Sequence, residues 1–234
     1  MSGSDFSSRQ GRPLDRVVRD PALRSAIGYW DSLRGTRLVP PRMALDPAQM
    51  RPHLQNAAIL EAPQPGTVRI RLAGARINAL MGMEVRGMPL RALFDLADRG
   101  RITDAAEEAL AAPMALIVDA RAPAPRYGVG REEEIRAQIA ILPMTDNDLA
   151  TTRALYVMGD IEGGMLRSGD QHRWSILGLD AIPLAANEPV VSSDRALGLA
   201  ATPRALPAGT SEREPELRGA FARARFRVIQ GGLA

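Results

Sequence analysis

The order in which two hydrophobic periodicities follow one another limits the folds available to this chain. Residues 56–62 and 66–73 read as two short strands with a turn rich in proline and glycine at 63–66 between them, and apolar residues alternate with arginines at 68–72, which predicts a β-hairpin. Residues 75–112 instead have the Ala-, Leu- and Met-rich pattern of several short helices. We therefore predict an α+β domain with one five-stranded antiparallel sheet and all these helices between strands two and three. The last three strands are expected at 114–121, 134–142 and 153–161.

A helix is predicted before the first strand. Asp20 can accept hydrogen bonds at a helix N-terminus, Pro21 fits the first helical turn, and Gly35 ends the pattern. Apolar residues recur at helical spacing between them, so the helix is amphipathic. Its apolar stripe suits two uses, packing on the outer face of the sheet or pairing with a second copy in a homodimer. The stripe includes Leu23, Ile27 and Trp30.

Polar segments flank this region and divide the chain into three parts. Residues 1–19 have no hydrophobic periodicity and are predicted to be a disordered lead, and residues 20–165 hold the domain. Residues 166–234 are predicted to be a largely irregular, extended tail with one candidate strand at 174–184. Near its end, at 217–229, arginines alternate with apolar residues as in a half-buried strand. We expect this basic motif to add to the sheet edge of a partner or a second copy, or else to cap its own sheet, through Arg223, Arg225, Phe226, Arg227 and Val228.

The residues at the predicted insertion point resemble a known family. From Arg69 to Leu90 the sequence RIRLAGARINALMGMEVRGMPL leads from a strand into a small helix, then to a glycine and to a second glycine before the next helix. This is similar to the signature of PAS domains, whose elements follow the same order. With Pro41-Arg42 and Leu45-Asp46-Pro47, it resembles the bacterial single-domain PAS proteins of the PAS_5 type, common in alphaproteobacteria. The likeness covers roughly residues 21–165 and implies a sensory or interaction module.

A fold of this kind encloses a space between the concave sheet face and the inserted helices. Its inward residues line either a ligand pocket or a filled core, and both remain open because alanine is abundant while the chain has only four phenylalanines. Two polar side chains, Asn78 and Tyr156, are expected to point into this space. The full predicted set is Ile59, Val68, Ile70, Leu72, Asn78, Leu93, Phe94, Leu110, Ile135, Ile139, Leu155, Tyr156 and Val157.

Composition removes several kinds of chemistry. The chain has no cysteine, which excludes thiolate catalysis and a cysteinyl-flavin adduct, and its thirty basic residues are all arginine, which excludes lysine Schiff bases. His53 and His172 are the only histidines, and neither lies at 101–112, where a haem-binding PAS domain would hold its iron. We interpret both as ordinary loop or helix-end histidines. No catalytic residue, metal site or haem is predicted, and the identity of any cofactor stays unknown.

These observations predict a non-enzymatic, cytoplasmic PAS-type regulator. It would bind a small molecule, or relay signals to other signalling proteins in trans. A pure interaction adaptor with a filled core is the first alternative, and a small α+β enzyme or a nucleic-acid-binding protein are the others. Four arginines after residue 217 exceed the formal net charge of +3 by themselves, so the rest of the chain is close to neutral, which argues against nucleic acid. The longest apolar run, at 109–118, is broken by Pro113 and too short to span a bilayer.

Overall fold

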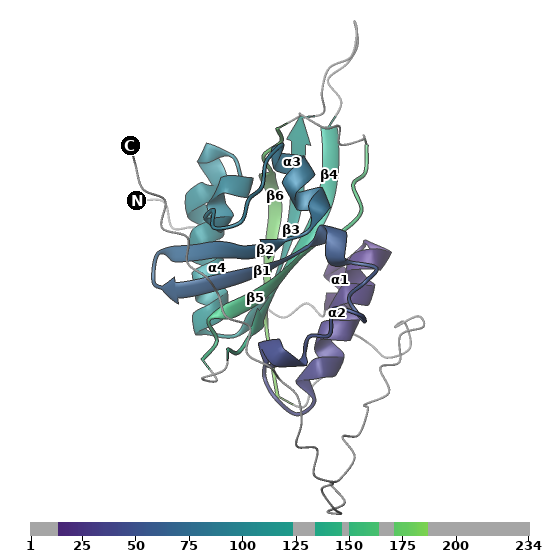
Figure 1. The fold of residues 1–234 in the computed structure, drawn as a ribbon, viewed down its shortest axis with the longest axis vertical. Helices are drawn as coiled ribbons and strands as arrows, with labels where there is room; N and C mark the ends of the chain where they lie inside the picture. The colour runs from purple at the N-terminus through teal and green to yellow at the C-terminus, as the bar shows by residue number, and fades with distance from the viewer. Residues whose placement is uncertain (1–13, 124–133, 147–149, 164–170, 187–234) are drawn as a thin grey trace, which may run out of the picture. The chain divides into compact units, whose positions relative to one another are not determined.

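Six antiparallel strands form one sheet in the computed structural model, which describes residues 14–123, 134–146, 150–163 and 171–186 (Figure 1). The order across the sheet is β2-β1-β5-β4-β3-β6, and every neighbouring pair is antiparallel. All five predicted strands are present, and the candidate strand at 174–184 forms the sixth. The strands are β1 (Ala57–Gln64), β2 (Thr67–Ala73), β3 (Met114–Pro123), β4 (Glu134–Met144), β5 (Arg153–Met158) and β6 (Ser175–Pro183).

Helices cover both faces of this sheet. Between β2 and β3 the chain forms short helices packed on one face, which we call the inner face, so the predicted insertion is confirmed. The N-terminal helices pack on the opposite, outer face, and Figure 1 shows α2 and α4 on opposite sides of the sheet. No helix within the described ranges is long and apolar enough to cross a bilayer. The helices are α1 (Leu14–Val17), α2 (Pro21–Arg34), η1 (Arg42–Ala44), η2 (Leu54–Asn56), α3 (Ala75–Met81), η3 (Leu90–Leu93), η4 (Leu96–Asp98) and α4 (Arg99–Ala111).

The central strands are buried on both faces. In β4, Ile139 and Ile141 point to the inner face and pack against the inserted helices, whereas Ala140 and Leu142 point to the outer face. The same division runs through β3 and β5. A sheet that is apolar on both sides needs a layer of helix on each side, because exposed apolar area is unfavourable in water.

The predicted amphipathic helix supplies the outer layer. The Asp20 carboxylate accepts a hydrogen bond from the Leu23 N–H at 2.6 Å and Pro21 occupies the first turn, as expected for a helix start. Leu23, Ile27 and Trp30 are fully buried, and the indole N–H of Trp30 donates to the Pro143 carbonyl at 3.2 Å. The structure therefore assigns this stripe to packing within the chain and not to a surface open to a second copy.

The predicted ends of the domain need correction. Residues 14–18 were expected in the disordered lead, yet Leu14–Val17 form α1, and Leu14 and Val18 are buried in the outer layer. The domain does not stop at 165, because β6 pairs with β3 and Trp174 is fully buried. The basic motif at 217–229 lies outside the described residues, with Arg223, Arg225, Phe226, Arg227 and Val228.

A β-bulge in β2 overturns the predicted direction of Leu72. Ile70 pairs with Leu60 and Leu72 pairs with Ile59, so Arg71 is an extra residue without a partner on β1. The extra residue reverses the alternation, and Leu72 shares a face with Ile59 instead of Ile70. Ile70 is fully buried on the inner face, while Leu72 lies on the outer face and is 51% exposed.

The bulge predicts opposite results for two substitutions in the same strand. Ile70→Asp should abolish folding, because an unpaired buried carboxylate costs several kcal/mol against a total stability of about 5–15 kcal/mol. Leu72→Asp should leave the thermal unfolding midpoint, measured by circular dichroism, within a few degrees of the parent. Equal damage from both substitutions would contradict the bulge.

Candidate functional site

Most of the residues expected to line a pocket lie together on the inner face of the sheet. Their side chains are at most 7% exposed and pack against one another and the inserted helices. They form the main hydrophobic core of the described chain. This set is Val68, Ile70, Leu93, Phe94, Leu110, Ile135, Ile139 and Tyr156.

Three further residues of the predicted set point the other way. Leu155 and Val157 are buried in the outer layer, and Ile59 packs against the same layer. Successive residues of a strand point to opposite faces, so Leu155 and Val157 cannot share the inner face with Tyr156. With Leu72, these residues are wrong predictions for an inner pocket.

Asn78 has a structural partner of its own. It lies in α3 and is partly exposed, and its side-chain oxygen accepts a hydrogen bond from the Val85 N–H at 3.1 Å. This bond holds the loop that follows α3. Asn78 therefore does not supply the polar group that was expected inside the core.

Tyr156 does place a polar atom inside the inner core. Its hydroxyl is fully buried and makes no hydrogen bond of normal geometry, and the same is true of the indole N–H of Trp174. Burial raises the pKa of Tyr156, and an interaction with Trp174 opposes that rise. The core thus holds two polar groups that only weakly satisfy each other, an unfavourable arrangement unless something else binds them.

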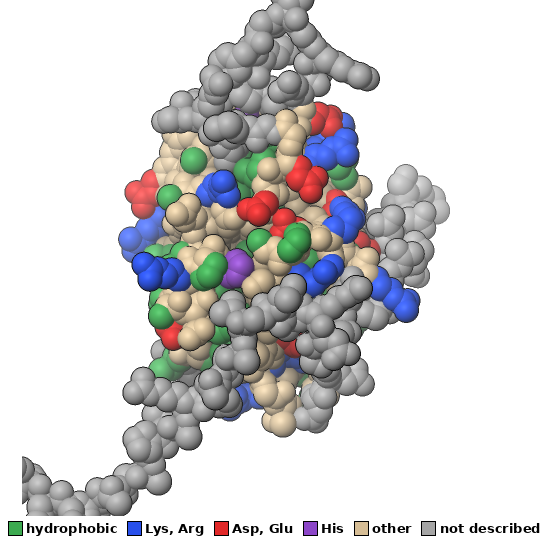
Figure 2. Space-filling model, turned by 90° about the vertical axis from the view of Figure 1, so that its right-hand side faces the viewer, with side chains coloured by type: hydrophobic (Ala, Val, Ile, Leu, Met, Phe, Trp, Pro, Cys, Tyr) green, Lys and Arg blue, Asp and Glu red, His purple; other side chains and the backbone are tan. Residues whose placement is uncertain are grey.

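A polar groove of about 370 Å³ opens on the outer face, beyond the N-terminal end of α2. Figure 2 shows acidic and basic side chains intermixed on the side of the molecule that carries α1 and α2. The groove combines both charges around a sheet surface that the helices leave uncovered. Its lining comprises Arg19, Asp20, Asp119, Ala120, Arg136, Ala137, Gln138, Asp160, Glu162, Leu177 and Gly178.

Gln138 of β4 is the centre of the hydrogen bonds in this groove. It is 7% exposed, and its side-chain oxygen accepts from the backbone N–H groups of Arg19 at 2.6 Å and Asp20 at 3.0 Å. Its amide nitrogen donates to the Val17 carbonyl at 3.1 Å and to Asp119 at 2.8 Å. One side chain therefore holds the junction between α1 and α2 against the sheet. The sequence analysis did not identify Gln138 as a site residue, although an uncharged amide next to the apolar run Ile139–Leu142 was a signal.

Asp20 makes the second attachment of this junction. Besides capping α2, its carboxylate accepts from the Asp160 N–H at 2.9 Å, just after β5. The contact requires a glycine at position 159, because a Cβ there would lie 2.7 Å from the Asp20 carboxyl carbon. The N-terminal end of α2 is thus connected to β4 and to the end of β5.

The histidines are more buried than a loop position suggests. His53, at the start of η2, is 7% exposed and its Nε2 atom makes no hydrogen bond. Burial holds the pKa of His53 below its ordinary value of 6.5, and the charges of Asp160 and Asp20 oppose that shift. His172 is 5% exposed, and its Nδ1 lies 2.9 Å from the Pro123 carbonyl oxygen. Within the described ranges no three His, Asp or Glu side chains gather so as to hold a metal ion.

Gln138→Leu should release the N-terminal helices without unfolding the sheet. The substitution leaves two backbone N–H groups without their acceptor, at a cost of about 1–3 kcal/mol each where they are shielded from water. We expect faster amide hydrogen exchange in residues 14–24 while exchange in β3 and β4 is unchanged. Arg136→Gln, on the same face of the same strand, is the control and should show parental exchange. Parental exchange in Gln138→Leu as well would contradict this role.

His53 should make stability depend on pH. Because its pKa is lower in the folded than in the unfolded chain, its contribution is complete above about pH 6.5 and is lost as pH falls and the unfolded state takes up the proton first. Urea denaturation at pH 7 and pH 5 should show a larger loss of stability for the parent than for His53→Gln. The other titrating groups are common to both proteins and cancel. Identical losses in the two proteins would refute this role of His53.

Comparison with known proteins identifies a family whose model matches this chain. The family model described as PAS_5, a PAS domain, matches residues 18–158, which is more than half of the chain. The match begins at the α1–α2 junction and ends with β5, so it includes the predicted insertion and the first five strands. A search of curated proteins gives no match. The alphaproteobacterial source stays a prediction. With its element order, its two-sided sheet and this match in agreement, the chain belongs to the PAS_5 family of PAS domains.

Proposed function

We propose that this chain is a non-enzymatic regulatory protein whose PAS domain relays signals through contacts with other signalling proteins. PAS domains serve sensory and regulatory roles in general. In this proposal the output of the domain is contact with another protein. The protein is also proposed to be bacterial and cytoplasmic and to act in trans, as the sequence predicts. One observation carries it: the junction between the N-terminal helices is fixed to the sheet by a few hydrogen bonds centred on Gln138.

The packing of the inner core favours a function through protein contacts over one through binding of a small molecule. The inward residues that could have lined a cavity are packed together, and Ile139 and Phe94 have no exposed surface. A filled core favours the adaptor that the composition left open, because side chains already occupy the space in which a ligand would lie.

The outer face of the sheet carries a helix, α2, whose contact with the sheet could be released. The apolar stripe of α2 is buried against β4 and β5, so its release would expose Trp30 and its neighbours. Gln138, Asp20 and Arg19 lie at one end of that stripe, where the groove admits solvent or a partner. A partner that binds the groove would thereby favour or oppose release of the helix.

A second candidate function, small-molecule sensing, rests on a different observation. The Tyr156 hydroxyl and the Trp174 N–H lie in an apolar core without adequate hydrogen bonds. A ligand with one polar atom could satisfy both if the surrounding side chains moved apart. This candidate requires an opening of the core that the contact proposal does not need.

The two candidates predict different behaviour for two variants. Under the contact proposal, Tyr156→Phe removes an unsatisfied hydroxyl and should leave the free energy of unfolding unchanged or raise it by about 1 kcal/mol. Gln138→Leu should change which signalling proteins co-purify with the chain from its own host, and Tyr156→Phe should not. Native mass spectrometry of the purified protein should give the mass of the chain alone.

Sensing predicts the reverse. The parent would then carry a small molecule in stoichiometric amount, and Tyr156→Phe would lose it. Such a result, with unchanged partners for Gln138→Leu, would replace the contact proposal by the sensing one. Turnover of the molecule would overturn the non-enzymatic reading as well.

A further inference from the structure

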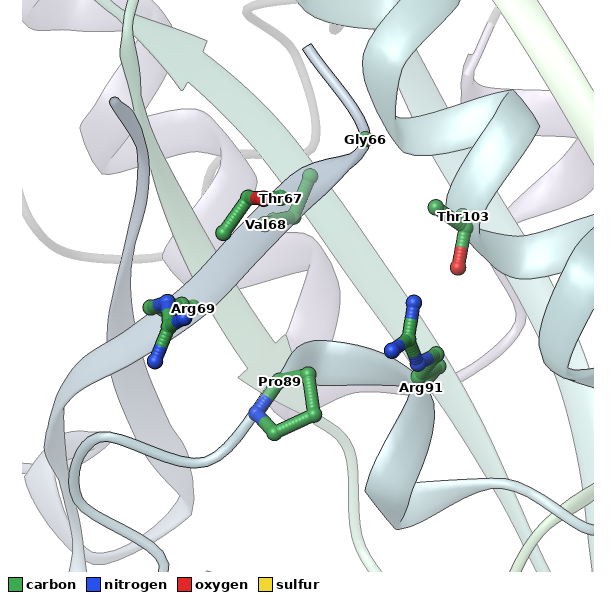
Figure 3. A pocket seen from close by; sticks show the side chains of 7 residues that line it. All are labelled: Gly66, Thr67, Val68, Arg69, Pro89, Arg91 and Thr103. Atoms are coloured by element: carbon green, nitrogen blue, oxygen red, sulfur yellow. The ribbon is translucent and has the colours of Figure 1, made fainter. Parts of the chain in front are cut away.

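The N-terminal helices cover only part of the outer face of the sheet. α2 packs on β4 and β5, while β2 lies at the edge of the sheet and is separated from β5 by β1. Figure 3, a close view beside β2, shows Thr67 pointing away from Thr103 of α4, the helix that packs on the inner face. Alternate residues of a strand share a face, so Thr67 and Arg69 both belong to the outer face. This part of the outer face has no helix of its own.

The pairing of three strands places an apolar row of side chains here. Leu72 of β2 lies across from Ile59 of β1, which in turn lies across from Leu155 of β5. Residues directly across from one another in antiparallel strands point to the same face. Exposure increases along the row toward the edge: Leu155 is 1% exposed, Ile59 is partly buried, and Leu72 is 51% exposed. The apolar row therefore starts in the outer layer and ends in solvent.

A charged row runs beside the apolar one, two residues further along β1. Glu61 lies across from Arg69 on β2 and across from Arg153 on β5. Arg153 pairs with one oxygen of the Glu61 carboxylate at 2.6 Å, and Arg71, the extra residue of the bulge, pairs with the other. Within the described ranges Arg69 itself forms no ion pair. Three arginines thus surround one carboxylate whose two oxygens are both engaged.

This surface presents its positive charge outward. Glu61 is only 8% exposed, whereas Arg69 and Arg71 are exposed. An approaching molecule therefore meets the guanidinium groups and Leu72 before it meets the carboxylate. We call this surface the β1–β2 face, and it consists of Ile59, Glu61, Arg69, Arg71, Leu72 and Arg153.

We propose that the β1–β2 face binds an acidic amphipathic helix of a partner protein. An apolar side chain of that helix would cover Leu72 and Ile59, and its carboxylates would pair with Arg69 and Arg71. Size favours a single helix, because a helix about 10 Å wide spans two strands about 4.8 Å apart and would continue the layer that α2 forms. Charge disfavours the same face of a second copy, since arginines would then meet arginines.

The inference goes beyond the proposed function, because the β1–β2 face does not include the Gln138 junction and its binding does not require release of α2. Gln138→Leu should therefore bind the acidic helix as the parent does. A failure of this inference would leave the proposed role of the Gln138 junction standing, and the reverse is also true.

Fluorescence anisotropy of labelled synthetic peptides, titrated with the full chain at low salt, tests the β1–β2 face. The acidic probe is a helical peptide with leucine at helical spacing and glutamate on the remaining face, and the matched peptide has glutamine in place of each glutamate. We expect saturable binding of the acidic probe that weakens as salt is added. The glutamine peptide should bind about tenfold more weakly or worse, because its hydrogen bonds to arginine are no longer charge-assisted.

Two pairs of variants locate the binding. Leu72→Asp should weaken binding of the acidic probe by about tenfold or more, since it removes an apolar contact and adds a like charge. Leu96→Asp is its control, because Leu96 is 79% exposed on η4, among the inserted helices. Arg69→Gln should also weaken binding by about tenfold, and Arg101→Gln, at an exposed position on α4, is the control with the same change of charge. Both controls should alter binding by less than about twofold.

Three results would overturn the proposal. They are no saturable binding of the acidic probe, equal weakening by a variant and its control, and tighter binding of a single-stranded oligonucleotide than of the probe through Arg69 and Leu72. The last result would assign the β1–β2 face to nucleic acid. Circular dichroism of each variant verifies that the fold is intact.

Discussion

Burial of the central strands on both faces is the constraint on which the rest of this structure depends. Ile139 and Leu142 of β4 point in opposite directions and both are fully buried, so neither face can be left to water. The inserted helices cover one side, and α1 with α2 cover the other. The N-terminal segment is therefore part of the domain and not an appendage, which explains why residues before position 20 are buried.

Polar contacts decide how that outer layer is attached. Apolar packing holds α2 on the sheet, but packing is not directional and allows helices to slide. Gln138 and Asp20 add direction, since each bonds to backbone groups at one end of the helix. A buried side chain with several partners is worth more than each bond alone, because its loss leaves several groups unsatisfied. This concentration at one point is what would make release of the helix a controllable event.

The two faces thus offer different routes for a PAS_5 protein to act. On the inner face lies an apolar core that contains two poorly satisfied polar groups, the Tyr156 hydroxyl and the Trp174 N–H. On the outer face lies α2, whose N-terminal end borders a groove lined by charged residues. These surfaces are spatially distinct, so substitutions can separate their contributions.

Local patterns in the sequence were enough to predict the order of strands and helices, the helix start at Asp20 and the turn of the first hairpin, because these depend on neighbours along the chain. These patterns did not predict which face of the sheet each strand residue would point to. Leu155 and Val157 look inward by composition, but the pairing of β5 with β1 and β4 turns them outward. A single extra residue at Arg71 reverses Leu72, and the candidate strand of the expected tail joins the domain because it pairs with β3 as β6. Face, register and hydrogen-bond partner are set by residues distant in the chain, so only the tertiary structure decided which side chains meet at Gln138 and at Tyr156.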